Sequence, residues 1–173
     1  MIYQFIGSYY ETPDFQLDIC VDASHTFADL HLALQSALGF QSAHLASFLI
    51  PGFNGSRKIE ISQLGTGIKN SRFFNMQNTL VGEMMNQQVK FICYVFDLLN
   101  DRFINLQLTG TNMEKNLREP LIIRNGGEIP VQSLDDVLTG EMFDFSEKKS
   151  ADPNYGVLND YFEIFGDMEE YVL

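Results

Sequence analysis

Hydrophobic and polar residues alternate near the start of the chain, and this period of two predicts β-strands. In the run DFQLDICVD the apolar positions are Phe15, Leu17, Ile19 and Val21, separated by polar or small residues, so one face of the strand is expected to be buried. The preceding run MIYQFI also has strand character, and YYETPD between the two runs is rich in turn residues. The chain therefore opens with a predicted hairpin.

The next pattern changes to the spacing of an α-helix. Apolar residues recur on one helical face at Phe27, Leu30, Leu34 and Leu38. Thr26 followed three residues later by Asp29 resembles a capping box, and Gly39 is a typical helix stop. These signals predict the main helix over about 27–38.

Most later apolar runs predict further strands. They are HLASFLI, ended by PGFNG, then VKFICYVF over 89–96, RFINLQLT over 102–109, and PLIIR. DLLND is short enough to join the second and third runs as an antiparallel hairpin, and NGGE predicts a turn with two glycines able to take positive φ. Between 55 and 78 only KIEIS resembles a strand, and QLGTGIKNSRFFN is predicted to be a loop. NTLVGEMM and SLDDVLTG predict short helices.

This order favours an α+β fold over regular βαβ alternation. We expect a mostly antiparallel, β-grasp-like sheet with one main helix packed across it and a few short helices, in preference to a ferredoxin-like sandwich. Three regions are predicted. Residues 1–143 form the core domain, the polar stretch 144–156 is a linker, and 157–173 is an acidic, aromatic C-terminal segment.

The composition limits the classes of protein to which the chain can belong. Hydrophobic residues make up 45% of the 173 positions, enough for a core. No run approaches the roughly 18 apolar residues of a membrane span, and the start does not resemble a secretory signal, so a cytoplasmic protein is expected. Cys20 and Cys93 lack the spacing of a zinc or redox motif and are expected to be half-buried packing residues; no metal or cofactor is predicted.

The charge balance disfavours direct binding of nucleic acid. The formal net charge is −12, and the 11 basic residues are scattered rather than clustered. The last 33 residues carry nine acids and two bases. Their aromatic side chains are candidate anchors for a protein partner or for self-association, with the acids selecting a basic surface. The named candidates are Tyr161, Phe162, Phe165 and Tyr171.

Four residues are weak candidates for chemistry. His31 and His44, together with Asp97 or Asp101, are suitable metal ligands or an acid–base pair. The alternative is structural: His31 hydrogen-bonds at the border of the core, His44 packs at a strand start, and the acids cap turn N–H groups. We favour this alternative because the spacing matches no known ligand motif. His25 is expected at the surface.

Three stretches together resemble the plasmid-Ri open-reading-frame-three-like family. They are TFADLHLALQSALGFQSAHLASFLI, YVFDLLNDRFINLQL and EPLIIRNGGEIPVQSLDD. The family's segment at the second stretch resembles YDFGDDW.H.I.L; here Asp97 and Asp101 remain, whereas the tryptophan and histidine are absent. The resemblance implies an association with plasmids and mobile elements, and it implies no reaction.

The expected function is therefore a protein-interaction or accessory module without catalysis. The alternative is a small metal-dependent or acid–base hydrolase that uses His31, His44, Asp97 and Asp101. A nucleic-acid-linked regulator would need a basic patch despite the net charge.

Overall fold

The structure, a computed structural model, describes most of the chain up to residue 133. The described ranges are 1–52, 58–64, 72–85, 89–113 and 115–133. They belong to one compact unit, Met1–Val137. The predicted linker 144–156, the segment 157–173 and the short helix predicted in SLDDVLTG after Ser133 lie outside the described residues.

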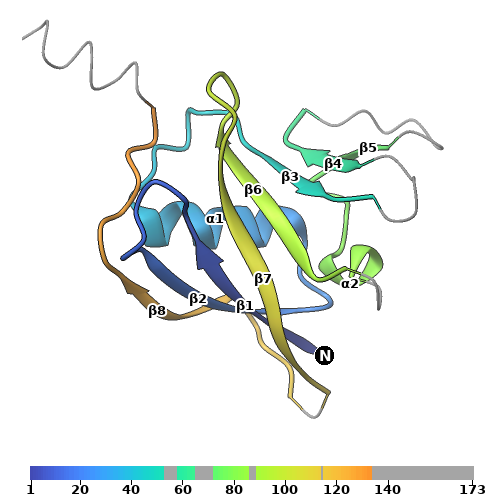
Figure 1. Ribbon diagram of the computed structural model, residues 1–173. Helices are drawn as coiled ribbons and strands as arrows, with labels where there is room; N and C mark the ends of the chain where they lie inside the picture. Colours follow the sequence, from blue (N-terminus) through green and yellow to red (C-terminus); the bar gives the residue numbers. More distant parts are fainter. Residues whose placement is uncertain (53–57, 65–71, 86–88, 114, 134–173) are drawn as a thin grey trace, which may run out of the picture. The chain divides into compact units, whose positions relative to one another are not determined.

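Eight strands of the described residues form a single sheet in the order β5-β4-β3-β6-β7-β1-β2-β8 (Figure 1). The strands are β1 (Ile2–Ser8), β2 (Gln16–Asp22), β3 (Ser47–Ile50), β4 (Ile59–Ser62), β5 (Phe73–Asn75), β6 (Phe91–Asp97), β7 (Arg102–Asn112) and β8 (Leu121–Gly126). The N-terminal hairpin β1–β2 is inserted between β7 and β8, both of which come much later in the chain. Every pair is antiparallel except β4 and β5, which run parallel and make the sheet mixed.

The predicted fold class is wrong. The described residues form mostly one mixed eight-stranded sheet with two helices, α1 (Phe27–Leu38) and the four-residue α2 (Val81–Met84), rather than a β-grasp-like α+β domain with an antiparallel sheet. The error arises at β5, which lies in QLGTGIKNSRFFN, a run predicted to be a loop, and which pairs in parallel with β4; β4 itself was predicted from KIEIS. A strand of three residues is too short to display a period of two, so the sequence pattern there resembled a loop.

Helix α1 begins and ends at the predicted residues. Thr26 Oγ1 accepts a hydrogen bond from the Asp29 amide at 3.1 Å, and Asp29 Oδ2 accepts one from the Thr26 amide at 2.8 Å. Gly39 ends the helix with φ 67°, a conformation that favours glycine. Two further N–H groups of the first turn donate to the carbonyls of Thr79 and Met76, which ties the helix to the segment after β5.

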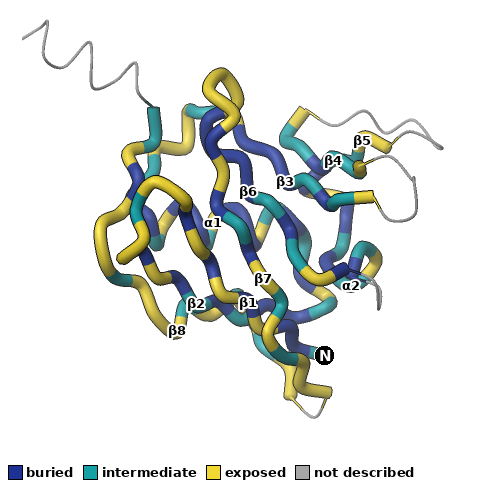
Figure 2. The backbone as a smooth tube through the Cα atoms, viewed as in Figure 1, coloured by how far each residue is buried: buried dark blue, intermediate teal, exposed yellow. Residues whose placement is uncertain are grey.

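The core contains the apolar side of α1 and the inward side chains of the sheet. Phe27 of α1, Phe48 of β3 and Tyr94 of β6 form a line of rings with centroids 5.1 and 5.0 Å apart. Figure 2 shows buried positions along the central strands and on α1, while the exposed positions concentrate in the loops. Neither described helix has the length and apolar character that a bilayer crossing requires.

Candidate functional site

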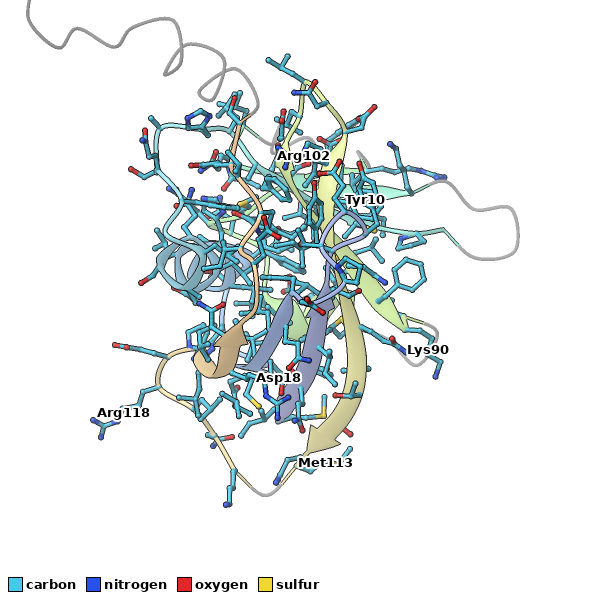
Figure 3. All side chains as sticks on the ribbon, turned by 60° about the vertical axis from the view of Figure 1, so that its left-hand side comes forward. Tyr10, Asp18, Lys90, Arg102, Met113 and Arg118 are labelled. Carbon is cyan, nitrogen blue, oxygen red and sulfur yellow. The ribbon has the colours of Figure 1, made fainter. Side chains whose placement is uncertain are left out.

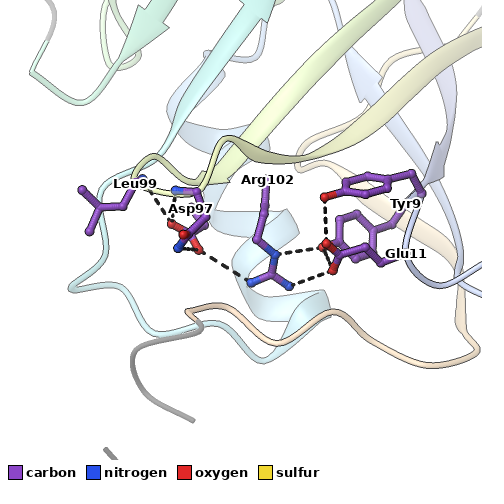
Figure 4. Close-up of polar contacts among 7 residues, drawn as sticks. Tyr9, Glu11, Asp97, Leu99 and Arg102 are labelled. Atoms are coloured by element: carbon purple, nitrogen blue, oxygen red, sulfur yellow. Dashed lines mark hydrogen bonds and ion pairs between the residues drawn. The ribbon is translucent and has the colours of Figure 1, made fainter. Parts of the chain in front are cut away.

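The β6–β7 hairpin carries an acid at each end of its turn. Asp97 Oδ1 accepts hydrogen bonds from the amides of Leu99 and Asn100, both at 3.2 Å, and Oδ2 accepts one from Asn100 Nδ2 at 2.9 Å (Figure 4). Asp101 has φ 53°, a left-handed conformation that aspartate tolerates in turns. The Asp97 carboxylate therefore stabilises the conformation of this turn.

A buried arginine, Arg102, follows the turn. Its side chain is 4% exposed and lies between two acids: Nη1 is 3.6 Å from Asp97 Oδ2, and Nη2 is 3.6 Å from Glu11 Oε2 (Figure 4). Nε donates to the Tyr9 hydroxyl at 2.9 Å, and that hydroxyl donates to Glu11 Oε2. The guanidinium also lies over the Phe96 ring, 5.1 Å from its centroid. We call Tyr9, Glu11, Asp97 and Arg102 the arginine network.

Three members of the arginine network, Tyr9, Glu11 and Asp97, have pKa values shifted away from neutral pH. Burial alone would raise the pKa of Asp97, but hydrogen bonds from Asn100 and Leu99 and the charge of Arg102 outweigh it and lower that pKa. Hydrogen bonds from Tyr9 and Tyr10 lower the pKa of Glu11. Burial, reinforced by Glu11, raises the pKa of Tyr9 to about 12. None of these three groups is set to exchange a proton near pH 7, which a general acid or base must do.

His31 lies in the core on α1, where both ring nitrogens have partners. Nδ1 is 2.9 Å from the Tyr94 hydroxyl, and Nε2 is 3.0 Å from Gln63 Nε2. Burial lowers the pKa of His31, so the neutral ring is favoured. This arrangement suits a structural imidazole that links α1 to β6.

His44 and Asp97 line a common pocket of about 370 Å³. His31 and Asp101 do not line it, so the structure brings together two of the four predicted residues. Asp97 already accepts several hydrogen bonds there. Among the described residues, no group of three or more His, Cys, Asp or Glu side chains is arranged to hold a metal ion.

Three leucines at this first pocket are exposed, and we call Leu45, Leu98 and Leu99 the leucine surface. Leu99 at the hairpin turn is 85% exposed, and the other two are about half exposed. Leu98 and Leu99 lie on the turn that Asp97 holds in shape, and Leu45 lies in the loop before β3, so the leucine surface combines two loops around one pocket.

A second pocket of about 510 Å³ lies where β1 ends and β7 begins. We call it the aromatic pocket; it is lined by Ser8, Tyr9, Tyr10, Pro13, Phe103 and Asn105. Tyr9 lines the aromatic pocket and Asp97 lines the first pocket, so the arginine network joins the two. Figure 3 shows Arg102 and Tyr10 at one end of the sheet, with Met113 and Arg118 toward the other end.

Reasoning from the sequence did not identify Arg102, Tyr9 or Glu11. Arg102 is the first residue of the alternating strand predicted over 102–109, but an arginine at a strand start is usually solvated by water, so its charge alone does not mark a site. The partners become visible only once β1 is paired with β7, with Ser8 opposite Asn105. His25, expected at the surface, is in fact buried, and its Nε2 lies 3.1 Å from the Leu117 carbonyl. Cys20 and Cys93 are free and half-buried, as predicted.

The predicted partner-binding residues are outside the described part of the chain. These are Tyr161, Phe162, Phe165 and Tyr171. Their role stays a prediction.

Comparison with known proteins gives a family and a similar fold. Residues 11–166 match the family model described as plasmid pRiA4b ORF-3-like protein. A solved structure, that of a protein of unknown function (MM3350) from Methanosarcina mazei Go1, is similar with a TM-score of 0.58 and 18% sequence identity; the match covers 72% of this chain and 68% of that chain. At this identity the similarity supports the fold alone. No curated protein matches the sequence significantly.

Proposed function

This chain belongs to the plasmid pRiA4b ORF-3-like family, and on that premise we propose that it is an accessory protein-interaction module that works without catalysis. The observation that carries the proposal is the leucine surface. Three exposed leucines lie around one pocket, and two of them, Leu98 and Leu99, are on the hairpin turn that Asp97 holds in shape. An exposed apolar surface marks a site of interaction, and a partner that buries side chains on a fixed turn loses little of its binding free energy to ordering that turn.

Charge favours a basic partner. The protein has 23 acidic and 11 basic residues, so its field attracts positively charged surfaces and speeds their encounter. We place this interaction in the cytoplasm, because the half-buried Cys20 and Cys93 are free thiols of the kind that reducing compartments maintain.

The alternative, a small metal-dependent or acid–base hydrolase, has less support. His44 and Asp97 do line one pocket, which is the observation in its favour. However, the Asp97 oxygens are already hydrogen-bonded, and the His31 nitrogens face Tyr94 and Gln63. A hydrolase would need a titrating group that is free to meet substrate.

Photo-crosslinking at Leu99 tests the proposal. Benzoylphenylalanine replaces Leu99 in the full-length chain inside cells, and the same probe at Ile123, an exposed residue of β8, is the matched control. We expect one discrete protein adduct from position 99 and none from 123. The adduct protein is then purified and titrated against the wild type and Leu99→Ser.

Loss of one apolar anchor should weaken this binding at least about tenfold, while the midpoint of urea unfolding stays unchanged because Leu99 is exposed. Equal adducts at both positions, or a Leu99→Ser variant that binds like the wild type, would contradict the leucine surface. Deleting 157–173 tests the separate proposal that Tyr161, Phe162, Phe165 and Tyr171 add affinity; an unchanged affinity rules out that contribution.

A further inference from the structure

We propose that the aromatic pocket binds an extended, proline-containing peptide segment with a basic residue beside it. The inference rests on the proposed function, because it assigns the chemistry of one segment of a protein partner. The aromatic pocket is a different site from the leucine surface, so this inference and the proposed function can fail independently.

The walls of the aromatic pocket are aromatic rings that hydrogen bonds hold in place. The buried Tyr9 ring is fixed through its hydroxyl by Arg102 and Glu11, and the Tyr10 ring meets it edge-on, with centroids 5.1 Å apart at 60°. The Tyr10 hydroxyl donates to Glu11 at 2.7 Å, which restrains the second ring as well. Tyr10 is nevertheless 68% exposed and Phe103 is 37% exposed, so both keep ring surface available to a ligand.

The polar group of the aromatic pocket is the side chain of Asn105. Its Oδ1 is buried and has no hydrogen-bond partner within the described part of the protein, an arrangement that costs free energy until a donor arrives. Oδ1 can only accept, and proline has no N–H, so the donor has to be the backbone N–H or the guanidinium of the basic residue beside the prolines. The Ser8 hydroxyl can donate to a carbonyl of the proline segment.

An extended proline-containing peptide satisfies these features best. In a polyproline II helix every carbonyl is free of internal hydrogen bonds, and the conformation is largely formed before binding. Such segments dock proline rings into aromatic-lined grooves. An α-helix would need apolar anchors over several turns, whereas the lining here comes only from the end of β1, the turn after it and the start of β7.

The charges near the aromatic pocket select the neighbouring residue of the peptide. The lining residues are uncharged. Two exposed acids, Glu11 and Asp14, lie on the β1–β2 turn beside them; because Glu11 already pairs with Arg102, Asp14 is the carboxylate of the two that lies outside the arginine network. The basic Arg102 is buried and already lies between two carboxylates. A lysine or arginine next to the proline segment is therefore attracted, and the phosphates of an oligonucleotide stacked on the same rings are repelled.

Titration of the ¹⁵N-labelled full-length protein tests the inference. The probe is a peptide of prolines ending in two arginines, and the matched control is a glycine–serine peptide of the same length and charge. We expect the proline peptide to bind at least about tenfold more tightly, with amide shifts at Ser8, Tyr10, Phe103 and Asn105. Equal binding of the two peptides, shifts confined to other residues, or tighter binding of oligothymidine would each overturn the proposal.

Variants separate this site from the leucine surface. Tyr10→Ala and Asn105→Ala should each weaken proline-peptide binding about tenfold. Because Tyr10 is exposed, Tyr10→Ala should fold like the wild type, so it tests the inference even if the NMR spectrum of Asn105→Ala is that of an unfolded protein. Leu99→Ser should leave peptide affinity unchanged. Wild-type affinity in Tyr10→Ala would overturn the inference, whereas an absent adduct at position 99 with intact peptide binding would overturn only the proposed function.

Discussion

Burial decides the role of two polar side chains, His31 and Arg102. The imidazole of His31 is enclosed between Tyr94 and Gln63, so it stays neutral and bridges a helix to the sheet. Asp97 and Glu11 lie on either side of Arg102 and compensate its charge in the interior. Arg102 thereby contacts Tyr9 and Asp97, each of which lines a pocket, whereas His31 lines neither pocket.

Replacing His31 by phenylalanine should reveal a pH-dependent contribution to stability. The variant leaves the buried Tyr94 hydroxyl without its partner, so the free energy of unfolding should fall by about 1–3 kcal/mol at neutral pH. Because burial lowers the pKa of His31, the unfolded chain binds the proton more readily; wild-type stability is therefore complete above pH 6.5 and declines below it.

The stability gap between wild type and His31→Phe should consequently narrow as the pH falls below 6.5. Urea unfolding at a series of pH values measures it. Leu32→Ala, an exposed change on the same helix, is the control and should keep a constant gap. A constant gap for His31→Phe would mean that the imidazole does not titrate differently on folding.

Replacing Arg102 by methionine should be among the most damaging single changes. It removes the counter-charge of the buried Asp97, and breaking a buried ion pair from one side typically costs about 3–5 kcal/mol. Adding Asp97→Asn to this variant should restore part of the loss, because the stranded charge disappears. Urea unfolding of the four proteins in a double-mutant cycle measures the coupling; fully additive effects would show that the two residues act independently.

At the scale of elements, local signals predicted the parts of the fold that are long and periodic. Helix α1 has a capping box, a regular apolar face and a glycine stop, and all lie within fourteen consecutive residues, 26–39. Strands β6 and β7 were likewise predictable from β-branched and aromatic runs. KIEIS likewise predicted β4, but β5 and its parallel pairing with β4 were not predictable, because β5 has three residues and its pairing depends on a strand that is folded elsewhere in the sheet.

The same distinction applies to the candidate site. Asp97 and His44 were named from residue type, and both line one pocket of the structure. The arginine network escaped prediction because Tyr9 and Arg102 are separated by more than ninety residues and meet only through the pairing of β1 with β7. Sequence patterns report which face of an element is buried, and they do not report which elements become neighbours.

The turn after β8 offers a sharp test at the element scale. Gly127 has φ 78°, and a Cβ there would overlap the Asp14 carbonyl oxygen, so Gly127→Ala should cost at least about 1–3 kcal/mol of unfolding free energy. Gly126 is the matched neighbour: no described atom lies within 4 Å of the position that a Cβ would take there, and Gly126→Ala should change stability by about 0.5 kcal/mol or less. Urea unfolding compares the two, and similar losses would contradict the assigned contact.

For the molecule as a whole, the net charge determines how stability responds to salt. The net charge is −12, so the acidic side chains repel one another in the compact state, and dissolved salt screens this repulsion. The buried pair Arg102–Asp97 is shielded from that screening by the protein around it.

Moderate salt should therefore stabilise the protein. Raising sodium chloride from about 0.03 M to about 0.3 M is expected to increase the Tm by about 2–5 °C in a calorimetric scan. Urea unfolding at both salt concentrations provides an independent check. A lower Tm at high salt would mean that exposed attractive pairs outweigh the overall repulsion.

The position of β1 in the middle of the sheet also sets the order in which the protein can mature during synthesis. Ile2 pairs with Asn112, so β1 keeps one open edge during synthesis until more than a hundred further residues have emerged from the ribosome. Until then the growing chain must hold its hairpin and helix in a partly assembled state, and a nascent chain stalled before β7 presents apolar strand edges to chaperones.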